Sequence, residues 1–300
     1  MITRTEYGGW ANNVKLSNGQ IELIATLDVG PRIIRFGFIG GQNMFKEFQD
    51  ELGSANESEF KLRGGHRFWT APEVVPRTYG ADNGPVALEE LDDYSIRLTS
   101  APEVENCVQK QIDVRLSAAA NEVTVIHRVT NIGRWDITLA PWALSIMDAG
   151  GKEFIPLPEQ RPHMGNFVPE TAIILWPVTE MSDSRIHWGR RYITFTQDRT
   201  KGPNKFGLIQ RLGWAAYLLH GQLFVKYFDY LPNETYADLG CNFETYSDER
   251  LLEVESLGPL TTLAPGESTE HVETWRLFAD IPELPDEASI DRVVLPLVQR

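Results

Sequence analysis

Two glutamates near the C-terminal end of the chain have the residue type and the spacing that acid–base chemistry needs. In the run 252–255 (LEVE), Glu253 and Glu255 alternate with apolar residues, so a strand here directs both carboxylates to one face. A Gly-Pro break and an Ala-Pro-Gly-Glu turn follow before a second alternating run, which predicts a hairpin-type unit over 251–278. Each carboxylate could act as a general base or bind hydroxyl groups, or could be an ion-paired residue on a solvated strand face.

A second group of chemistry-bearing side chains follows a pair of glycines. The run GGHRFWTAPE contains His66, Arg67 and Glu73, and paired glycines allow the backbone to approach a ligand closely. Because the sequence stays rich in proline up to position 85, we expect an irregular loop rather than a central strand. His66 could be a site residue or could hold this loop through the backbone. Arg67 and Glu73 could contact a ligand or form a structural ion pair.

Three further polar side chains are candidate substrate ligands. Lys226 lies between Phe224 and Phe228 on one face of a predicted strand. It either extends past an apolar sheet or reaches into a cleft, where it would bind hydroxyl or carboxylate oxygens. Asp238 could accept hydrogen bonds from hydroxyl groups or form a turn. Arg35 could bind substrate or belong to a solvated strand face.

Other kinds of chemistry find no support in the sequence. His127 alternates with three valines, which is typical of a core histidine with satisfied hydrogen bonds. Cys107 and Cys241 are too few for a disulfide framework, and they lack the His/Cys spacing of a zinc site. The sequence contains neither a Gly-x-Ser-x-Gly elbow nor a phosphate-binding GxxxxGK loop. We therefore expect no metal and no nucleophilic hydrolysis.

The net charge of the chain indicates which classes of binding partner are compatible with its surface. Among 300 residues, 28 Lys and Arg stand against 42 Asp and Glu, which gives a formal net charge of −14. Such a surface repels nucleic acid and anionic membranes, so a neutral small-molecule ligand fits better. The sequence shows no signal peptide and no apolar run of membrane-spanning length, which makes the cytoplasm the expected compartment.

The elements that must position these residues are predominantly strands. Alternating runs recur around 95–100, 108–116, 122–130, 135–147 and 223–229, separated by turn residues and without intervening helical periodicity. An Asn-Gly pair at 18–19 predicts an early hairpin, and an acidic stretch over 45–60 is expected to be a loop or a short helix. This pattern predicts an all-β fold of antiparallel sheets in a single domain over 1–300, with a short helix at the tail.

Several of these motifs resemble a known family. The run GGHRFWTAPE, the Asp82-Asn83 pair after it, APWALS at 140–145 and LEVESLGPLTTLAPGE followed by HVETWRLF are similar to an uncharacterised family of the galactose mutarotase-like (aldose 1-epimerase) superfamily. The resemblance covers most of the chain. It implies a β-supersandwich of large twisted antiparallel sheets with a sugar site on a sheet surface.

The resemblance also implies roles for particular residues. In mutarotases a late Glu takes the proton from the anomeric hydroxyl while a His delivers one to the ring oxygen, and no cofactor is required. Glu255 matches the position of that Glu, with Glu253 as the alternative, and His66 lies where a first active-site His is found. Trp142 stands near the place of the second His, where it would serve as a stacking platform for a sugar.

Three functions follow from the resemblance and remain open at this point. The first is an aldose 1-epimerase-like isomerase that uses Glu255 as the base and His66 as the acid. The second is a sugar-binding protein that kept the fold without the catalytic acid. The third is a lyase- or hydrolase-associated domain of the same superfamily, because a fold does not fix its chemistry.

Overall fold

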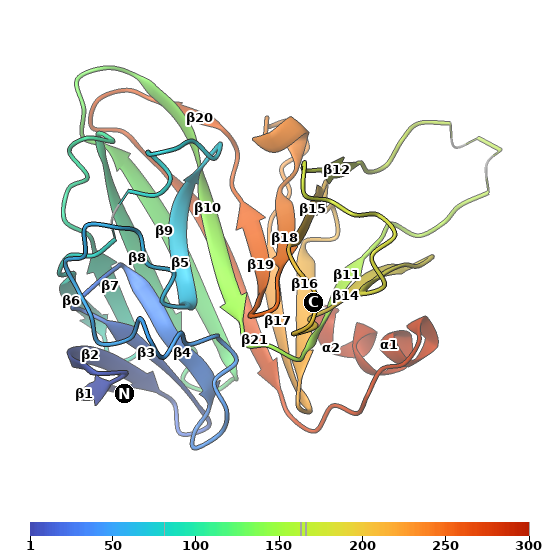
Figure 1. Ribbon diagram of the computed structural model, residues 1–300, viewed down its shortest axis with the longest axis horizontal. Helices are drawn as coiled ribbons and strands as arrows, with labels where there is room; N and C mark the ends of the chain where they lie inside the picture. Colours follow the sequence, from blue (N-terminus) through green and yellow to red (C-terminus); the bar gives the residue numbers. More distant parts are fainter. Residues whose placement is uncertain (81, 163, 166, 300) are drawn as a thin grey trace.

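The alternating runs form two large antiparallel sheets in a computed structural model, which describes residues 1–80, 82–162, 164–165 and 167–299 (Figure 1). The larger sheet runs, in spatial order, β1 (Ile2–Tyr7), β2 (Trp10–Ser17), β3 (Ile21–Thr26), β4 (Arg32–Phe38), β5 (Gly65–Ala71), β10 (Ile137–Met147), β19 (Leu252–Leu257), β18 (Phe243–Ser247), β15 (Asn204–Leu208) and β12 (Ile173–Leu175), with β20 (Thr261–Leu263) paired to β10. The predicted all-β class and the early hairpin at Asn18-Gly19 are confirmed.

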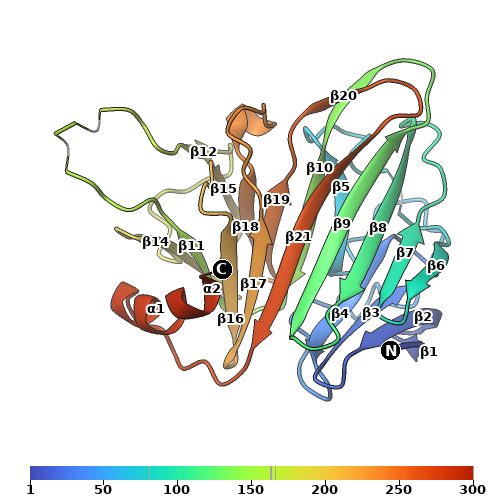
Figure 2. The same ribbon diagram turned by 180° about the vertical axis from the view of Figure 1, so that it is seen from behind.

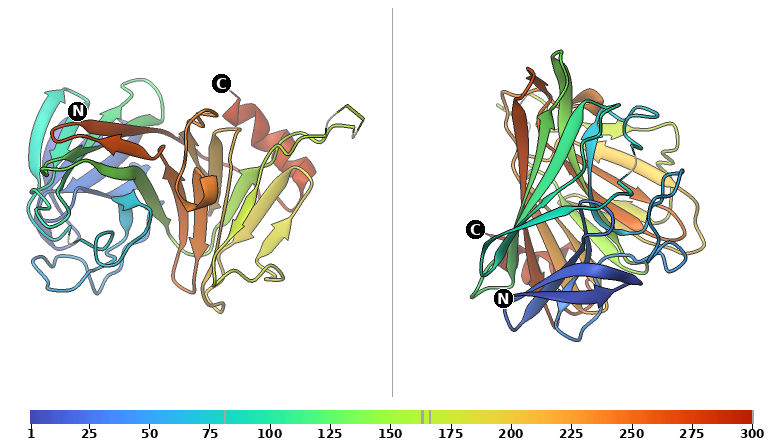
Figure 3. Two further views of the ribbon diagram at one scale, coloured as in Figure 1. Left: turned by 90° about the horizontal axis from the view of Figure 1, so that it is seen from above. Right: turned by 90° about the vertical axis from the view of Figure 1, so that its left-hand side faces the viewer.

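The second sheet lies behind the first, as the reverse view shows (Figure 2). Its order is β13 (Ile186–Trp188), β14 (Tyr192–Thr196), β11 (Lys152–Pro156), β16 (Trp214–Leu219), β17 (Gln222–Phe228), β21 (Ser268–Phe278), β9 (Glu122–Asn131), β8 (Val108–Leu116), β7 (Ser95–Thr99) and β6 (Ala87–Asp92). Seen from above, the molecule shows the two layers edge-on (Figure 3, left). Apolar side chains from both inner faces fill the space between them.

Helices are few and short. The predicted tail helix is confirmed as α1 (Glu287–Val293), which Asp286 caps by accepting a hydrogen bond from the Ser289 N–H, followed by α2 (Leu295–Val298). Both pack on the outer face of the second sheet through a cluster that includes Ile290 and Val294. A 3₁₀ turn, η1 (Asp238–Gly240), lies between β17 and β18. The acidic stretch over 45–60 forms a loop rather than a helix.

Two expectations about local structure were wrong. The run GGHRFWTAPE is not an irregular loop, because Gly65–Ala71 forms β5, a buried central strand paired with β4 and β10. The segment 251–278 is not a hairpin, because β19 and β21 belong to different sheets. The link between these strands crosses from one sheet to the other, and its middle part returns to β10 as β20.

Of the several connections that pass from one sheet to the other, one joins β10 to β11 through residues 148–151. There the Gly151 N–H donates to the Tyr217 hydroxyl at 2.9 Å, and that hydroxyl donates to the Asp148 carbonyl at 2.6 Å. A Cβ at position 151 would overlap the Tyr217 ring and the Leu218 carbonyl. The crossing therefore depends on the absence of a side chain at Gly151.

Candidate functional site

The outer face of the larger sheet carries a row of polar residues from strands that are distant in sequence. Leu144 on β10 pairs with Arg67 on β5 and with Glu255 on β19, and Glu255 pairs in turn with Glu244 on β18. Directly opposed residues in an antiparallel sheet share a face, so these side chains lie side by side. The neighbouring strands are seen together in the middle of Figure 1.

A cavity of about 360 Å³ lies above this row. Its floor comes from β5, β10, β19, β18 and β15, and its walls come from segments around residues 60, 79 and 177 that fold over the sheet. The lining residues are Phe60, Leu62, Arg67, Trp69, Glu73, Tyr79, Trp142, Leu144, Trp176, Val178, Lys205, Tyr246, Asp248, Arg250, Leu251, Glu253 and Glu255. Aromatic rings thus surround a small set of charged groups, which is the usual composition of a small-molecule site.

Glu255 lies fully buried at the floor of this cavity. The Trp142 indole N–H donates to its Oε2 at 2.9 Å, whereas its Oε1 has no hydrogen-bond partner among the described residues. Burial raises the pKa of Glu255 to about 8, and the carboxylates of Glu253 and Glu244 add to the rise while the Lys205 ammonium opposes it. This side chain can therefore gain and lose a proton near neutral pH.

Lys205 holds its ammonium group between two carboxylates and two indole rings. Its Nζ lies 2.6 Å from Glu244 Oε2 and 3.7 Å from Glu255 Oε2. It also lies 4.8 Å from the ring centroids of Trp142 and Trp176. Burial disfavours the charged amine, but the two carboxylates outweigh it and raise the pKa of Lys205. Burial in turn raises the pKa of Glu244 to about 7 against the pull of Lys205.

Arg67 and Glu73 both line the cavity, but they do not pair with each other. The Arg67 guanidinium stacks on Trp69 with its Cζ 3.8 Å from the ring centroid, and it donates to Glu253 at 3.0 Å. Its Nε and Nη1 are buried without a partner among the described residues. Glu73 instead accepts a hydrogen bond from the Tyr79 hydroxyl at the exposed rim.

The structure does not bring His66 into this cavity, and the expectation of a His66–Glu255 pair is corrected. His66 precedes Arg67 on the same strand, so its side chain points to the opposite face, into the space between the sheets. There its Nδ1 is hydrogen-bonded to the Ser145 hydroxyl at 2.9 Å and its Nε2 to His127 Nε2 at 2.7 Å. Burial lowers the pKa of His66 well below its usual value. The prediction of His127 as a core histidine is confirmed.

Lys226 belongs to the same interior cluster, which corrects its expected place in a cleft. Its Nζ lies 2.8 Å from Glu273 Oε1 and donates to the Val254 carbonyl at 2.8 Å. Burial lowers its pKa while Glu273 opposes the shift. His66, His127 and Glu273 offer possible metal-ligand atoms within 4.8 Å of one another. Those atoms could hold an ion only if the two histidines gave up their mutual hydrogen bond.

The remaining two candidates lie outside the cavity lining. Arg35 on β4 does not line the cavity and instead donates to Glu22 at 2.9 Å and to the Gly41 carbonyl at 2.8 Å, so its expected ligand role is corrected to an ion pair. Asp238 in η1 does not line the cavity, although its carboxylate contributes to the raised pKa of Glu244. Its expected contact with a substrate is replaced by this indirect effect.

Several residues in or beside the cavity were missed by the sequence prediction. Lys205 alternates with Phe206 and Glu244 alternates with Phe243, so the signal was the same one that identified Glu255. Trp176 carries no such signal, because it follows a short edge strand and reaches the site from a loop. Strand alternation thus identifies residues of the floor but not those of the walls.

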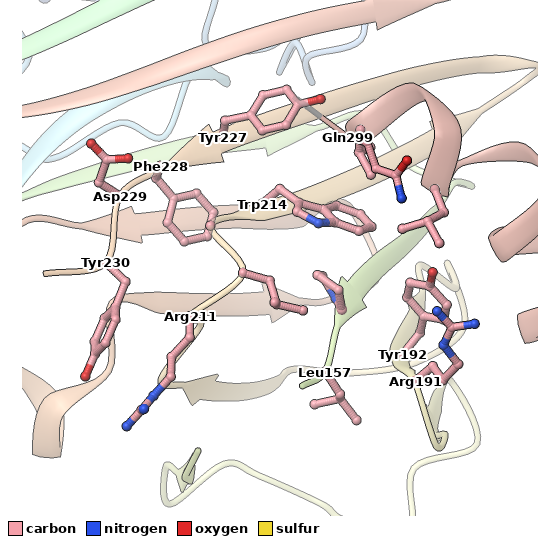
Figure 4. Close-up of a pocket in the computed structure, with 15 residues that line it drawn as sticks. Leu157, Arg191, Tyr192, Arg211, Trp214, Tyr227, Phe228, Asp229, Tyr230 and Gln299 are labelled. Carbon is pink, nitrogen blue, oxygen red and sulfur yellow. The ribbon is translucent and has the colours of Figure 1, made fainter. Parts of the chain in front are cut away.

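A second cavity, of about 490 Å³, lies beside the C-terminal helix on the second sheet (Figure 4). Trp214, Tyr227 and Tyr192 form its aromatic surface, and Arg211 and Asp229 lie at its edge. None of the predicted site residues lines it. It lacks the buried carboxylates of the first cavity, which therefore remains the candidate site for acid–base chemistry.

The two large antiparallel sheets form a β-sandwich, and solved structures share this fold. A galactose mutarotase-like protein from Lactobacillus casei superimposes with a TM-score of 0.60 at 11% identity, covering 89% of this chain and 100% of that one. The Slr1438 protein from Synechocystis gives 0.61 at 10% identity, with 92% and 99% covered. A galactose mutarotase-like protein from Clostridium acetobutylicum gives 0.55 at 10%, with 93% and 98% covered.

This likeness establishes the fold that the sequence motifs predicted, namely the galactose mutarotase-like fold. No protein-family profile matches the sequence. No curated protein sequence matches it either. Among the described residues, no helix combines the length and the apolar character needed to cross a membrane.

Proposed function

We propose that the protein binds an aldose sugar in the cavity above Glu255 and interconverts its two anomers. The observation that carries this proposal is the Glu255 carboxyl group, which is buried at the cavity floor with Oε1 unpartnered among the described residues and with a pKa of about 8. A general base works best when its pKa lies near the working pH. The mutarotase-like fold supports the same reading.

The cavity walls suit a pyranose ring. The apolar face of a sugar stacks on aromatic rings, and Trp69, Trp142 and Trp176 present such surfaces. The unpartnered N–H groups of Arg67 and the carboxylates of Glu253 and Glu73 supply donors and acceptors for hydroxyl groups. A volume of about 360 Å³ accommodates a monosaccharide and leaves little room for more.

The chemistry assigned to Glu255 is removal of the proton from the anomeric hydroxyl. The electron pair of the broken O–H bond then forms the carbonyl at C1. The bond from C1 to the ring oxygen breaks, and the ring oxygen takes a proton. Rotation about the C1–C2 bond followed by closure gives the other anomer. The Trp142 indole N–H orients the carboxylate, because it donates to Oε2 at 2.9 Å, while Oε1 has no hydrogen-bond partner among the described residues.

Anomer equilibration tests this function directly. Freshly dissolved α-anomers of a panel of aldoses, each followed by polarimetry or NMR, should equilibrate faster with the protein than in buffer. Glu255→Gln should lower the catalysed rate by about 10²–10⁴-fold, which is the usual contribution of a general base. Glu105→Gln, which changes an exposed glutamate on the second sheet's side, is the matched control and should retain the full rate. Equal rates for wild type and buffer with every sugar would refute the proposal.

A second function, sugar binding without catalysis, is favoured by one observation. None of the described residues that line the cavity is a histidine, although mutarotase-like chemistry uses an imidazole to protonate the ring oxygen. If binding alone is the function, sugars should raise the melting temperature of both wild type and Glu255→Gln while neither protein accelerates equilibration.

A further inference from the structure

Ring opening at this site needs a proton donor, and the described lining offers few. Arg67 cannot serve, because a guanidinium does not release its proton in proteins. Glu253 is engaged by Arg67 at 3.0 Å. The Tyr79 hydroxyl donates to Glu73 at the exposed rim of the cavity. His66 lies on the other face of the sheet.

Lys205 has the geometry that the other groups lack. The anomeric oxygen and the ring oxygen are bonded to the same carbon, so a base and an acid that each reach one of them must themselves lie close together. Lys205 Nζ and Glu255 Oε2 are 3.7 Å apart, and both residues line the cavity. Each can therefore approach its own oxygen within hydrogen-bond reach, about 3 Å.

The surroundings of Lys205 fix its ammonium in this position. Glu244 Oε2 holds the Nζ at 2.6 Å, and Glu244 itself does not line the cavity. The indole rings of Trp142 and Trp176, each with its centroid 4.8 Å from the Nζ, restrict the ammonium from two further directions. A lysine side chain that would otherwise sample many rotamers is thus held beside the base.

We propose that Lys205 protonates the ring oxygen while Glu255 removes the anomeric proton, and that Glu244 is a positioning residue for the Lys205 ammonium. This inference rests on the proposed epimerase function and names its missing acid. In the forward step the bond between C1 and the ring oxygen breaks, and the ring oxygen keeps its electron pair. That pair takes the proton from an N–H bond of Lys205, which breaks. Lys205 is left as a neutral amine and Glu255 as a carboxylic acid.

Ring closure returns both groups to their starting state. The neutral amine takes the proton of the hydroxyl group as its oxygen attacks C1 from the opposite face, and Glu255 returns a proton to the carbonyl oxygen. No oxidant, metal or co-reactant is consumed. Because both directions use the same two groups, the pair catalyses α-to-β and β-to-α conversion alike.

Three variants at position 205 test the proposal with a sugar that wild type equilibrates. Lys205→Met removes the donor, and Lys205→Arg keeps a positive charge beside Glu244 and Glu255 but cannot release its proton. Both should lower kcat about 10²–10⁴-fold while sugar-induced thermal shifts persist. Lys205→Cys alkylated with 2-bromoethylamine restores a titratable amine and should recover most of the rate. Lys201→Met, at an exposed lysine nearby, should behave as wild type.

The outcomes separate this inference from the function on which it rests. Full activity of Lys205→Arg would overturn the inference and leave the epimerase function intact. Recovery by a neutral alkylating reagent, such as iodoacetamide on Lys205→Cys, would show that only bulk is needed and would also overturn it. If the wild-type protein does not accelerate anomer equilibration of any aldose, the proposed function is refuted, and the inference about Lys205 is refuted with it.

Discussion

At the scale of single residues, the candidate site depends on burying charged groups beside one another. Glu255, Lys205 and Glu244 are all at least nine-tenths buried, and two carboxyl groups share one ammonium. Isolated charges are costly to remove from water, so burial raises the pKa of both Glu244 and Glu255. Burial of these three charged groups lowers the stability of the fold, and the same burial gives Glu255 a pKa suited to proton transfer.

The pKa of Glu255 predicts the pH dependence of catalysis. Because the charged carboxylate is the base and its pKa is about 8, the active fraction rises with pH up to that value and then levels off. After subtraction of the buffer reaction, kcat/KM should therefore increase roughly tenfold per pH unit below the pKa. A profile that falls as pH passes the pKa would show that the protonated carboxyl group is the active form, and a flat profile would show that the ionisation of Glu255 does not control the rate.

Glu244→Gln sharpens this prediction. The variant removes a neighbouring carboxylate that raises the pKa of Glu255 and frees Lys205 to pair with Glu255 instead. Both changes favour the charged form of Glu255, so the rising limb should move to lower pH. An unchanged limb, measured under the same conditions, would contradict the electrostatic coupling of the trio.

Residue-level prediction from the sequence succeeded where alternation alone decides the outcome. The expected shared face of Glu253 and Glu255 is confirmed, since both line the cavity while Leu252 and Val254 enter the core. His66 was misplaced because the glycines before it were interpreted as a loop signal. In a strand, His66 and its neighbour Arg67 face opposite sides, so only one of them could reach a site on one face.

At the scale of elements, a buried polar cluster joins strands of the two sheets. The Lys226–Glu273 ion pair links β17 with β21, Lys226 also donates to the Val254 carbonyl of β19, and the Trp275 indole N–H donates to Glu273 at 2.7 Å. Ser256 on β19 donates to the same carboxylate at 2.6 Å. The cluster therefore fixes the relative position of the sheets at their centre, directly beneath the candidate site.

Removing one partner of this ion pair should be strongly destabilising. Lys226→Met leaves the Glu273 carboxylate buried without its cation, a loss of about 3–5 kcal/mol in the free energy of unfolding. The double variant Lys226→Met/Glu273→Gln removes both charges and should recover most of that loss. Urea denaturation of the wild type and the two variants measures both effects. Equal losses in the single and double variants would mean that the pair's charges do not govern stability.

Element-level prediction was limited by pairing between distant segments. The bounds of β8 agree with the alternating run, because periodicity is local information. The predicted hairpin over 251–278 was wrong, because β19 pairs with the preceding strand β18 on one side and, on the other, with β10, which lies more than a hundred residues earlier in the chain. Walls of the cavity formed by loops, such as Trp176, depend on the same long-range arrangement.

At the scale of the whole molecule, one of the connections between the two sheets runs from β10 to β11, and this connection is packed too tightly to accept a side chain at Gly151. Gly151→Ala would push a methyl group into the Tyr217 ring and the Leu218 carbonyl, and overpacking of this kind costs about 1–3 kcal/mol. Guanidinium denaturation should report this loss. Gly202→Ala, where a methyl group meets open space, is the control and should change stability far less. Similar stabilities for both variants would show that the β10–β11 connection has room for a methyl group at position 151.

The alternation of the floor strands has a consequence for how such a protein diversifies. On β5, β10, β18 and β19, every second side chain fills the core and the intervening ones face the cavity, so folding and ligand chemistry are encoded in separate residues of the same strands. A library that varies only Trp69, Leu144, Tyr246 and Glu253 would therefore sample new ligand preferences on an unaltered interior. The same separation lets a tryptophan occupy position 142 within this fold without repacking the interior, so the residues that face the ligand can change while the sheets keep their packing.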